Sequence, residues 1–286
     1  MTADPLVELS DPRAPRVRRI RSLAGRSVRG RQGRFLIEGP QGVRSVLTHR
    51  PGWVMQVFLT PQSAQRHPDV ADLARQVAPR DTLMGTEKVL DAMSPDAQGV
   101  VAVARIVAEE PVGIFGAPLV AFLHQVRDPG NAGTVIRAAD ASGAAAVVLS
   151  AASVDLHNPK TVRSTAGSMF HLPVLTGADL ATSVERARSA GMQVLAADGE
   201  GQVELDDLAD AAASRAGMAD GVAATVDLRR PTMWVFGNEA HGLTATERES
   251  ADAVVRIGIH GHAESLNLAM AATLCLFASA RAQRGR

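Results

Sequence analysis

Short apolar runs alternate with amphipathic stretches through the second half of the chain. The apolar runs have the length of buried strands and are found at Leu119–His124, Ala146–Leu149, Gln193–Ala196 and Met233–Phe236. Apolar residues at helical spacing fall between them, at Ala132–Ser142, Leu180–Ala190 and Thr244–Glu249. Because strands and helices alternate, this half predicts a parallel sheet covered by helices, which is an α/β fold.

The first part of the chain predicts a smaller α/β domain. A basic helical pattern runs from Val17 to about Leu47 and is interrupted at Gln32-Gly33. Further elements are predicted as strands at Phe35–Gly39, Trp53–Leu59 and Val100–Ala104 and as a helix at Val70–Val77. Residues from Glu109 to Pro118 have little periodicity and several breakers, which indicates a linker.

These patterns predict three segments. We expect an N-terminal domain at 1–108, a linker at 109–117 and a second domain at 118–286. Within the second domain, residues 205–230 are rich in Ala and Asp and are longer than a compact connection needs. We expect a surface insertion there, with a helix of its own.

Composition adds an electrostatic asymmetry to this picture. The chain has 286 residues, 46% of them hydrophobic, and a formal net charge of zero, so it can bury a sizeable core. The segment from Arg13 to Arg34, however, is rich in arginine and has no acidic residue. Such a segment suits a nucleic-acid phosphate backbone. The arginines that we single out as candidate contacts are Arg18, Arg19, Arg29, Arg31 and Arg34.

Cysteine, histidine and the longest apolar stretch each exclude a class of protein. The single cysteine, Cys275, rules out an intrachain disulfide and a cysteine-rich zinc site, and it favours a reducing cytoplasm. The eight histidines show no paired metal-ligand spacing around a carboxylate, so we expect no catalytic metal. The apolar stretch Leu266–Ala280 is interrupted by Asn267 and Thr273, so it predicts a helix but no membrane span. Motifs typical of dinucleotide-binding, P-loop and α/β-hydrolase proteins are missing.

Three segments place chemically capable side chains where predicted strands end and helices begin, the edge at which open α/β sheets bind ligands. They are Asp128–Arg137, Gly237–Gly242 and Glu264–Asn267. Each residue also has a structural interpretation. Asn131 and Ser265 fit helix N-caps as well as active-site groups, and Arg137 fits a solvated helix face.

In this order, and followed by the apolar C-terminal helix, the three segments resemble the SpoU/TrmH family of RNA ribose 2′-O-methyltransferases, which use S-adenosylmethionine (SAM). The resemblance covers roughly Leu119 to the C-terminus. It implies an active site made of Asn131, Arg137, Glu239, Ser265 and Asn267. It also implies cofactor contacts at Gly237, Ile257 and Leu266, and no metal. Gly258 is a departure, since family members commonly have proline there.

The same resemblance extends to fold and partners. It implies a deep trefoil knot in the second domain and a homodimer that brings Arg137 of one chain towards the cofactor of the other. The strings Arg34–Gly39 and Gln98–Val103 look like the family's N-terminal substrate-binding domain. A further similar stretch contains Lys160 and Arg163, which we take as RNA contacts, with solvated surface or packing as the alternative.

The substrate implied by this resemblance is RNA. We expect 23S rRNA first and tRNA second. Two other readings stay open: a non-catalytic knotted RNA-binding protein, and an enzyme that methylates a base nitrogen of RNA.

Overall fold

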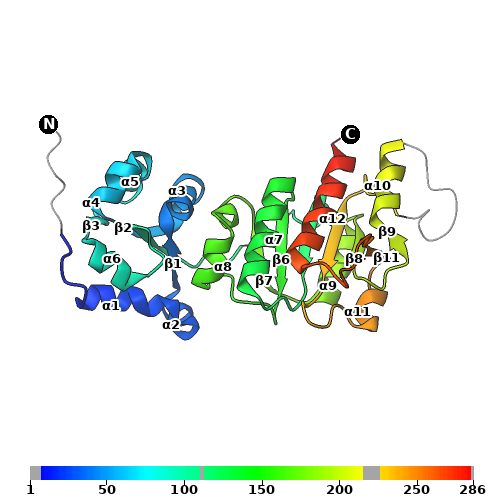
Figure 1. The fold of residues 1–286 in the computed structure, drawn as a ribbon, viewed down its shortest axis with the longest axis horizontal. Coiled ribbons are helices and arrows are strands. Elements are labelled where there is room, and N and C mark those ends of the chain that lie inside the picture. The colour runs from blue at the N-terminus through cyan, green and yellow to red at the C-terminus, as the bar shows by residue number, and fades with distance from the viewer. Residues whose placement is uncertain (1–7, 110–112, 215–225, 285–286) are drawn as a thin grey trace. The chain divides into compact units, whose positions relative to one another are not determined.

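The chain forms two compact units in the computed structural model, which describes residues 8–109, 113–214 and 226–284 (Figure 1). The first unit combines Met1–Ala108 with Asp155–His171, and the second combines Glu109–Val154 with Leu172–Arg286. The sequence places residues 155–171 within the second domain, but in the structure they pack with the first unit. The chain therefore contributes to the first unit in two separate stretches.

The first unit is built on a four-stranded sheet with the order β1-β4-β2-β3, in which β2 and β3 are parallel and the other pairs antiparallel. Its strands are β1 (Arg34–Glu38), β2 (Val54–Leu59), β3 (Thr82–Met84) and β4 (Val100–Arg105). Its helices are α1 (Pro15–Arg21), α2 (Arg26–Gln32), α3 (Gly39–His49), α4 (Pro61–Arg66), α5 (Pro68–Val77), α6 (Glu87–Met93) and α8 (Pro159–Ser164). The predicted break at Gln32-Gly33 is where α2 ends, because Gly33 adopts a left-handed conformation with φ of 61°.

The segment Asp155–His171 is fixed to the rest of the first unit by specific contacts. The Ser45 hydroxyl donates to the Gly167 carbonyl at 2.9 Å. A Cβ on Gly167 would lie 2.7 Å from the Ser45 Cβ, and its φ is +98°, so only glycine fits this position. Further along, the Phe170 ring packs edge-on against Trp53. These contacts explain why the segment belongs with α3 and its neighbours.

The second unit contains a seven-stranded parallel sheet with the order β7-β6-β5-β10-β8-β11-β9. Its strands are β5 (Leu119–Leu123), β6 (Ala146–Ser150), β7 (Val174–Ala178), β8 (Gln193–Ala197), β9 (Val203–Glu204), β10 (Thr232–Phe236) and β11 (Ala253–Arg256). Its helices are α7 (Pro129–Ser142), α9 (Leu180–Ser189), α10 (Leu205–Ser214), α11 (Ala245–Glu249) and α12 (Leu268–Gln283). The predicted α/β fold with a parallel sheet is confirmed.

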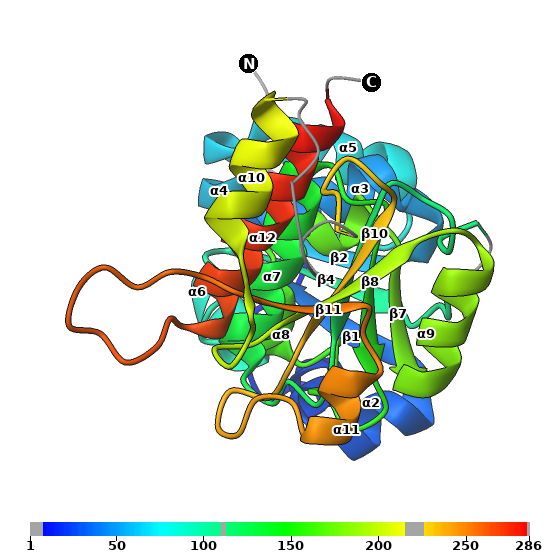
Figure 2. The same ribbon diagram turned by 90° about the vertical axis from the view of Figure 1, so that its right-hand side faces the viewer.

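Helices cover both faces of this sheet. Figure 2 shows α7 and α12 on one face and α9 on the other. Successive side chains of β10 point to opposite faces of the sheet. Met233 and Val235 pack in the core beneath α9, whereas the Trp234 indole donates to the Ser279 hydroxyl of α12 at 2.9 Å. Because the strands are parallel, their carboxyl ends lie at one edge, where the loops of the candidate site begin.

Two expectations about the chain's periphery can be compared with the structure. Of the insertion predicted at 205–230, residues 205–214 form α10, whereas 215–225 lie outside the described residues. Among the helices of the described ranges, none has the length and apolar character needed to cross a bilayer.

Candidate active site

A tight loop after β10 presents Glu239 at the carboxyl edge of the sheet. The backbones of Asn238 and Gly242 exchange two hydrogen bonds, of 3.2 and 2.9 Å, which close the loop on itself. A Cβ on Gly237 would lie 2.6 Å from the Gly242 carbonyl carbon, so this glycine is required by loop closure. Asn238 is buried and its side-chain amide donates to the Gln125 carbonyl at 2.7 Å. The loop therefore exposes Glu239 from a fixed base.

The Glu239 carboxylate connects this loop to the segment between β5 and α7. It accepts hydrogen bonds from the backbone N–H groups of Arg127 at 3.2 Å and Asp128 at 3.1 Å. It also accepts one from the Asn131 side-chain amide at 3.2 Å. A carboxylate has enough lone pairs for all three donors. Glu239 thus holds two loops in one geometry, although they are more than a hundred residues apart in the chain.

Asn131 extends the network to the C-terminal helix. Its side-chain oxygen accepts from the Asn267 amide at 3.0 Å, and the Asn267 oxygen in turn accepts from the Ala269 N–H and caps α12. The N-cap of α7 is Asp128, whose carboxylate accepts from the Asn131 N–H at 2.8 Å. The capping interpretation of Asn131 is therefore wrong, because α7 begins at Pro129 and Asn131 lies inside the helix. Its side chain faces the network instead.

Arg137 and Ser265 lie outside this network. Arg137 is exposed on α7 between the buried residues Ile136 and Ala138. Ser265 is exposed in the segment before α12, where the cap is Asn267. Within the described residues, neither side chain has a hydrogen bond or ion pair. Both are free to meet a ligand or a second chain.

A cavity of about 420 Å³ adjoins the network at the ends of β8, β10 and β11. All three residues predicted to contact the cofactor line it, namely Gly237, Ile257 and Leu266. Glu239 and Ser265 line it as well, so the structure brings these five predicted residues to one site. A Cβ on Gly258 would lie 3.4 Å from the His260 ring, an ordinary contact, so the local packing does not require glycine there.

The sequence interpretation missed an ionic cluster on the wall of this cavity. The Arg248 guanidinium lies 2.8 Å from the Glu200 carboxylate and 3.6 Å from that of Asp198, and it donates to the Leu243 carbonyl at 3.1 Å. Asp198 comes directly after β8, at the same edge of the sheet as Glu239. Its place at a strand end was the available signal, by the same reasoning that identified Glu239.

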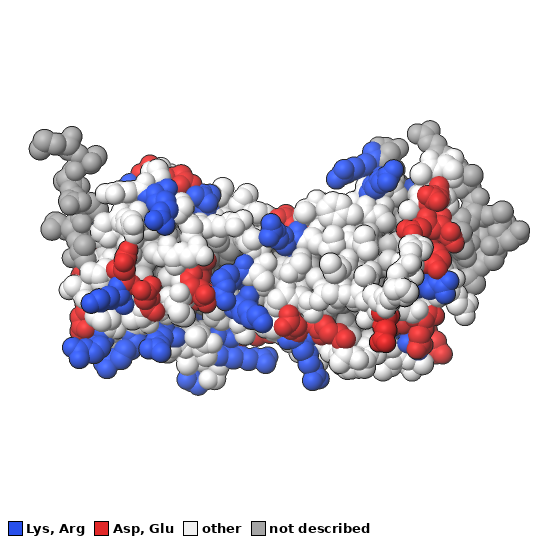
Figure 3. Space-filling model, in the orientation of Figure 1, with Lys and Arg blue, Asp and Glu red and all other residues white. Residues whose placement is uncertain are grey.

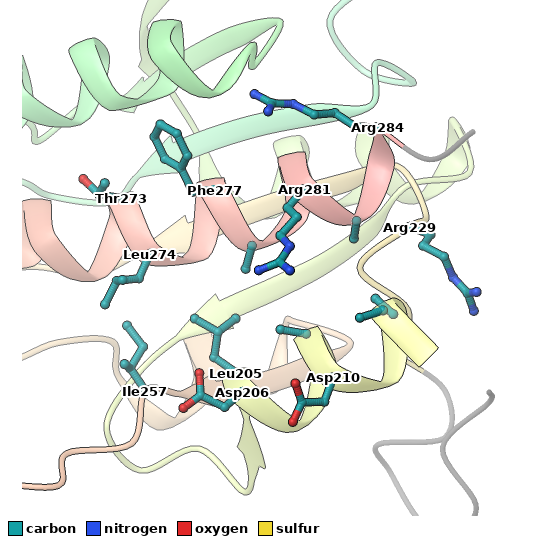
Figure 4. Close-up of a pocket in the computed structure, with 15 residues that line it drawn as sticks. Leu205, Asp206, Asp210, Arg229, Ile257, Thr273, Leu274, Phe277, Arg281 and Arg284 are labelled. Atoms are coloured by element: carbon teal, nitrogen blue, oxygen red, sulfur yellow. The ribbon is translucent and has the colours of Figure 1, made fainter. Parts of the chain in front are cut away.

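A larger cavity of about 910 Å³ lies between α10 and α12 (Figure 4). Its lining is largely apolar, including Leu205, Leu274 and Phe277, with Asp210 and Arg281 from the two helices. It shares Ile257 with the smaller cavity but contains none of the predicted catalytic residues. The predicted cofactor contacts and the predicted catalytic residues Glu239 and Ser265 therefore lie at the smaller cavity, despite its lesser volume.

The predicted RNA contacts divide into exposed and engaged residues. Arg29 is buried, with its guanidinium donating to the carbonyls of Leu23 and Ala24 and to Asp155 at 2.6 Å. Burial alone would raise the pKa of the Asp155 carboxyl, but the hydrogen bond from Arg29 helps to hold it below its usual value. Arg29 therefore stabilises the fold and is unavailable to phosphate, which corrects its assignment.

Arg163 is also occupied by carboxylates. Its guanidinium lies 2.7 Å from both Glu38 and Asp96. The remaining candidates at the surface are Arg18, Arg19, Arg31 and Lys160, with Arg34 half-buried. Figure 3 shows Lys and Arg gathered over α1 and α2. We call this surface, which includes Arg18, Arg19 and Arg31, the basic surface of the first unit.

No group of three or more His, Cys, Asp or Glu side chains suited to a metal occurs within residues 8–109, 113–214 and 226–284. The site of this chain consists of hydrogen-bonding groups beside a cavity, and Arg137 does not line that cavity. Such a site can bind an organic ligand in the cavity and orient a second molecule beside it.

Known proteins are similar in sequence to this chain over nearly its full length. A 23S rRNA (uridine(2479)-2′-O)-methyltransferase of Streptomyces viridochromogenes is 28% identical over 94% of this chain and 94% of its own. The 23S rRNA (guanosine(2553)-2′-O)-methyltransferase RlmP of Bacillus subtilis is 27% identical over 94% of this chain and 98% of its own.

Solved structures give the same result. The AdoMet-bound rRNA methyltransferase of Sinorhizobium meliloti aligns with a TM-score of 0.76 and 29% identity, over 96% of this chain and 97% of its own. AviRb of Streptomyces viridochromogenes in complex with AdoMet aligns with a TM-score of 0.74 and 28% identity, over 96% of this chain and 100% of its own. A profile of the SpoU rRNA Methylase family matches residues 118–277, more than half of the sequence, and the chain therefore belongs to that family.

Proposed function

We propose that this protein transfers a methyl group from SAM to a ribose 2′-hydroxyl of RNA, with 23S rRNA as the first candidate substrate and tRNA as the second. The observation that carries the proposal is the hydrogen-bonded network of Glu239, Asn131 and Asn267 beside the smaller cavity. The relatives named as 23S rRNA 2′-O-methyltransferases support the choice of substrate.

The smaller cavity suits SAM in size and lining. Its volume of about 420 Å³ lies within the usual range for small-ligand pockets. Ile257 and Leu266 offer apolar surface to an adenine ring, and the backbone beside Gly237 offers hydrogen-bonding groups. Two similar structures contain AdoMet. When bound, SAM supplies an electrophilic methyl group on a sulfonium.

The residues around the cavity would position the acceptor. Asn131 and Asn267 orient the ribose, and Glu239 fixes Asn131 through its hydrogen bond. A guanidinium is not deprotonated in proteins, so we assign Arg137 an electrostatic role and not that of a base. It therefore orients the RNA phosphate and stabilises the developing alkoxide, while phosphate or water receives the proton. Ser265 completes the acceptor side.

A homodimer is part of the proposal. Arg137 has no partner in the described part of its own chain, and family members bring this arginine to the neighbouring subunit's cofactor. On α12, Met270, Leu274 and Phe277 are 61%, 47% and 41% exposed, which is unusual for large apolar side chains on one helix. A second copy of this chain is the occupant that we assign to this surface. The trefoil knot and a cytoplasmic location stay predictions.

Incubation with methyl-labelled SAM and unmodified rRNA and tRNA, in parallel, tests the proposal. Digestion to nucleosides should release a 2′-O-methylnucleoside. One linkage of the RNA should resist alkaline cleavage, because that cleavage needs a free 2′-hydroxyl. A labelled base would instead identify a base-nitrogen methyltransferase. If neither RNA is labelled while SAM binding is intact, the result would favour a non-catalytic RNA-binding protein.

A further inference from the structure

The short helix α11 follows the Glu239 loop directly and is fixed by polar contacts. It is five residues long and buries none of its own side chains, so hydrophobic packing does not hold it in place. On one side, Arg248 meets Asp198 and Glu200. On the other side, the Glu247 carboxylate lies 2.7 Å from Nε2 of His124. The second contact reaches the segment between β5 and α7.

His124 contacts both ends of the chain stretch that carries Glu239. Its backbone N–H donates to the carbonyl of Phe236 at 2.8 Å, just before the loop begins. Its ring binds Glu247, just after the loop ends. Further along the same segment, the backbone N–H groups of Arg127 and Asp128 donate to Glu239 itself. His124 is thus placed to set the spacing between the two active-site loops.

The chemistry of the pair favours a fixed geometry. A carboxylate only accepts hydrogen bonds, so Nε2 of His124 carries the proton in this contact. Nδ1 is buried and has no hydrogen-bond partner among the described residues, so the polar contacts of the ring are made through Nε2, which also lies 3.1 Å from the Gln125 amide nitrogen. The ring also stacks on Phe122. The second oxygen of Glu247 accepts from the Thr244 N–H at 2.7 Å and completes the capping box of α11. Burial alone would raise the pKa of Glu247, but the hydrogen bonds from Thr244 and His124 help to hold it below its usual value.

We propose that His124 and Glu247 are positioning residues for methyl transfer. Their hydrogen bond fixes the Glu239 loop against the segment that presents Asn131, and neither residue lines the smaller cavity. The inference rests on the proposed function. Loss of the hydrogen bond between His124 and Glu247 should misplace the acceptor groups. Small misplacements of reacting groups lower rates by up to about a hundredfold.

The test uses full-length His124→Ala, Glu247→Ala, the double variant and His124→Gln, which retains a side-chain N–H near the position of Nε2. We expect each alanine variant to lose roughly 10- to 100-fold in kcat. KM for SAM should change by no more than about threefold, and His124→Gln should regain most of the rate. The double variant should lose no more than either single variant, because both remove one contact.

Val184→Ala is the control for general destabilisation, since Val184 lies on the buried face of α9 and belongs to neither loop. If it lowers both Tm and kcat as much as His124→Ala does, the positioning role is rejected. The role is also rejected if the two single losses multiply in the double variant. Glu247→Ala keeps the test valid if His124→Ala does not fold, because α11 buries no residue. An inactive wild-type protein would reject the proposed function itself, whereas an active wild type with equally active variants would reject only this inference.

Discussion

Asn131 and Asn267 are 136 positions apart in the chain, yet their side-chain amides lie 3.0 Å from each other. Asn267 uses its oxygen to cap α12 and its nitrogen to reach Asn131, which in turn binds Glu239. The start of the C-terminal helix and the geometry of the proposed acceptor site are therefore set by one side chain.

Asn267→Ala should lower both stability and methyl transfer. Loss of an N-cap reduces the free energy of unfolding by about 1 kcal/mol, and loss of the amide leaves Asn131 held by Glu239 alone. Asn158→Ala is a matched control, because Asn158 caps α8 by the same contact to the residue two positions on. Urea unfolding and methylation assays should show similar destabilisation in both variants but loss of activity only in Asn267→Ala. Equal activity in the two would remove Asn267 from the acceptor site.

Arg137→Ala should reduce transfer at least roughly a hundredfold, in line with the loss of a group that stabilises developing negative charge. SAM binding, measured by calorimetry, should stay nearly unchanged, because Arg137 does not line the smaller cavity of its own chain. Arg186→Ala, another exposed arginine on a helix of the same unit, serves as the control. A parallel loss of binding and transfer would instead assign Arg137 a structural role.

Phe277→Glu should convert the proposed dimer to a monomer in light scattering and abolish transfer with it. A carboxylate placed on the exposed apolar face of α12 would have to lose its hydration in a subunit interface, which is costly. Ala181→Glu adds the same charge on α9, on the other face of the sheet, and should leave the molar mass unchanged (Figure 2). A wild-type protein that is already monomeric and active would contradict the proposed assembly.

The first unit should lose stability as the pH falls below 6.5. Burial lowers the pKa of His157 from 6.5 to about 4, so the unfolded chain takes up a proton that the folded chain resists. The stabilisation is complete above pH 6.5 and is lost progressively between 6.5 and 4, by up to about 3 kcal/mol. Urea unfolding at pH 7 and 4.5 measures the difference. His157→Gln should show a smaller difference between the two conditions, and an equal one would exclude His157 as the cause.

The sequence predicted those elements whose apolar pattern is uninterrupted. The central strands β5, β6, β8 and β10 are continuous buried runs and were predicted within a residue or two. The strand β7 was missed because Thr176 and Gly177 interrupt a short and partly exposed segment. Edge strands of this kind take their conformation from a neighbouring strand, which local pattern does not encode.

Contacts between distant residues limited the prediction of the site. The three motifs identified the residues of the Glu239 network, because strand ends converge at one edge of a parallel sheet. Nothing local to Arg29 indicates that Asp155 pairs with it, since the two are 126 positions apart. In the same way, His124 and Glu247 meet only after the sheet has formed.

The first unit is built from two separate stretches of the chain, which limits how it can be exchanged between related proteins. Asp155–His171 leaves the second unit after β6 and returns before β7. A chimera made by a single junction at the linker would pair a foreign N-terminal half with the native Asp155, Arg163 and Gly167. Matching Arg29, Glu38 and Ser45 would then be needed in the donor sequence. The first unit can therefore be exchanged between relatives only by replacing both stretches together.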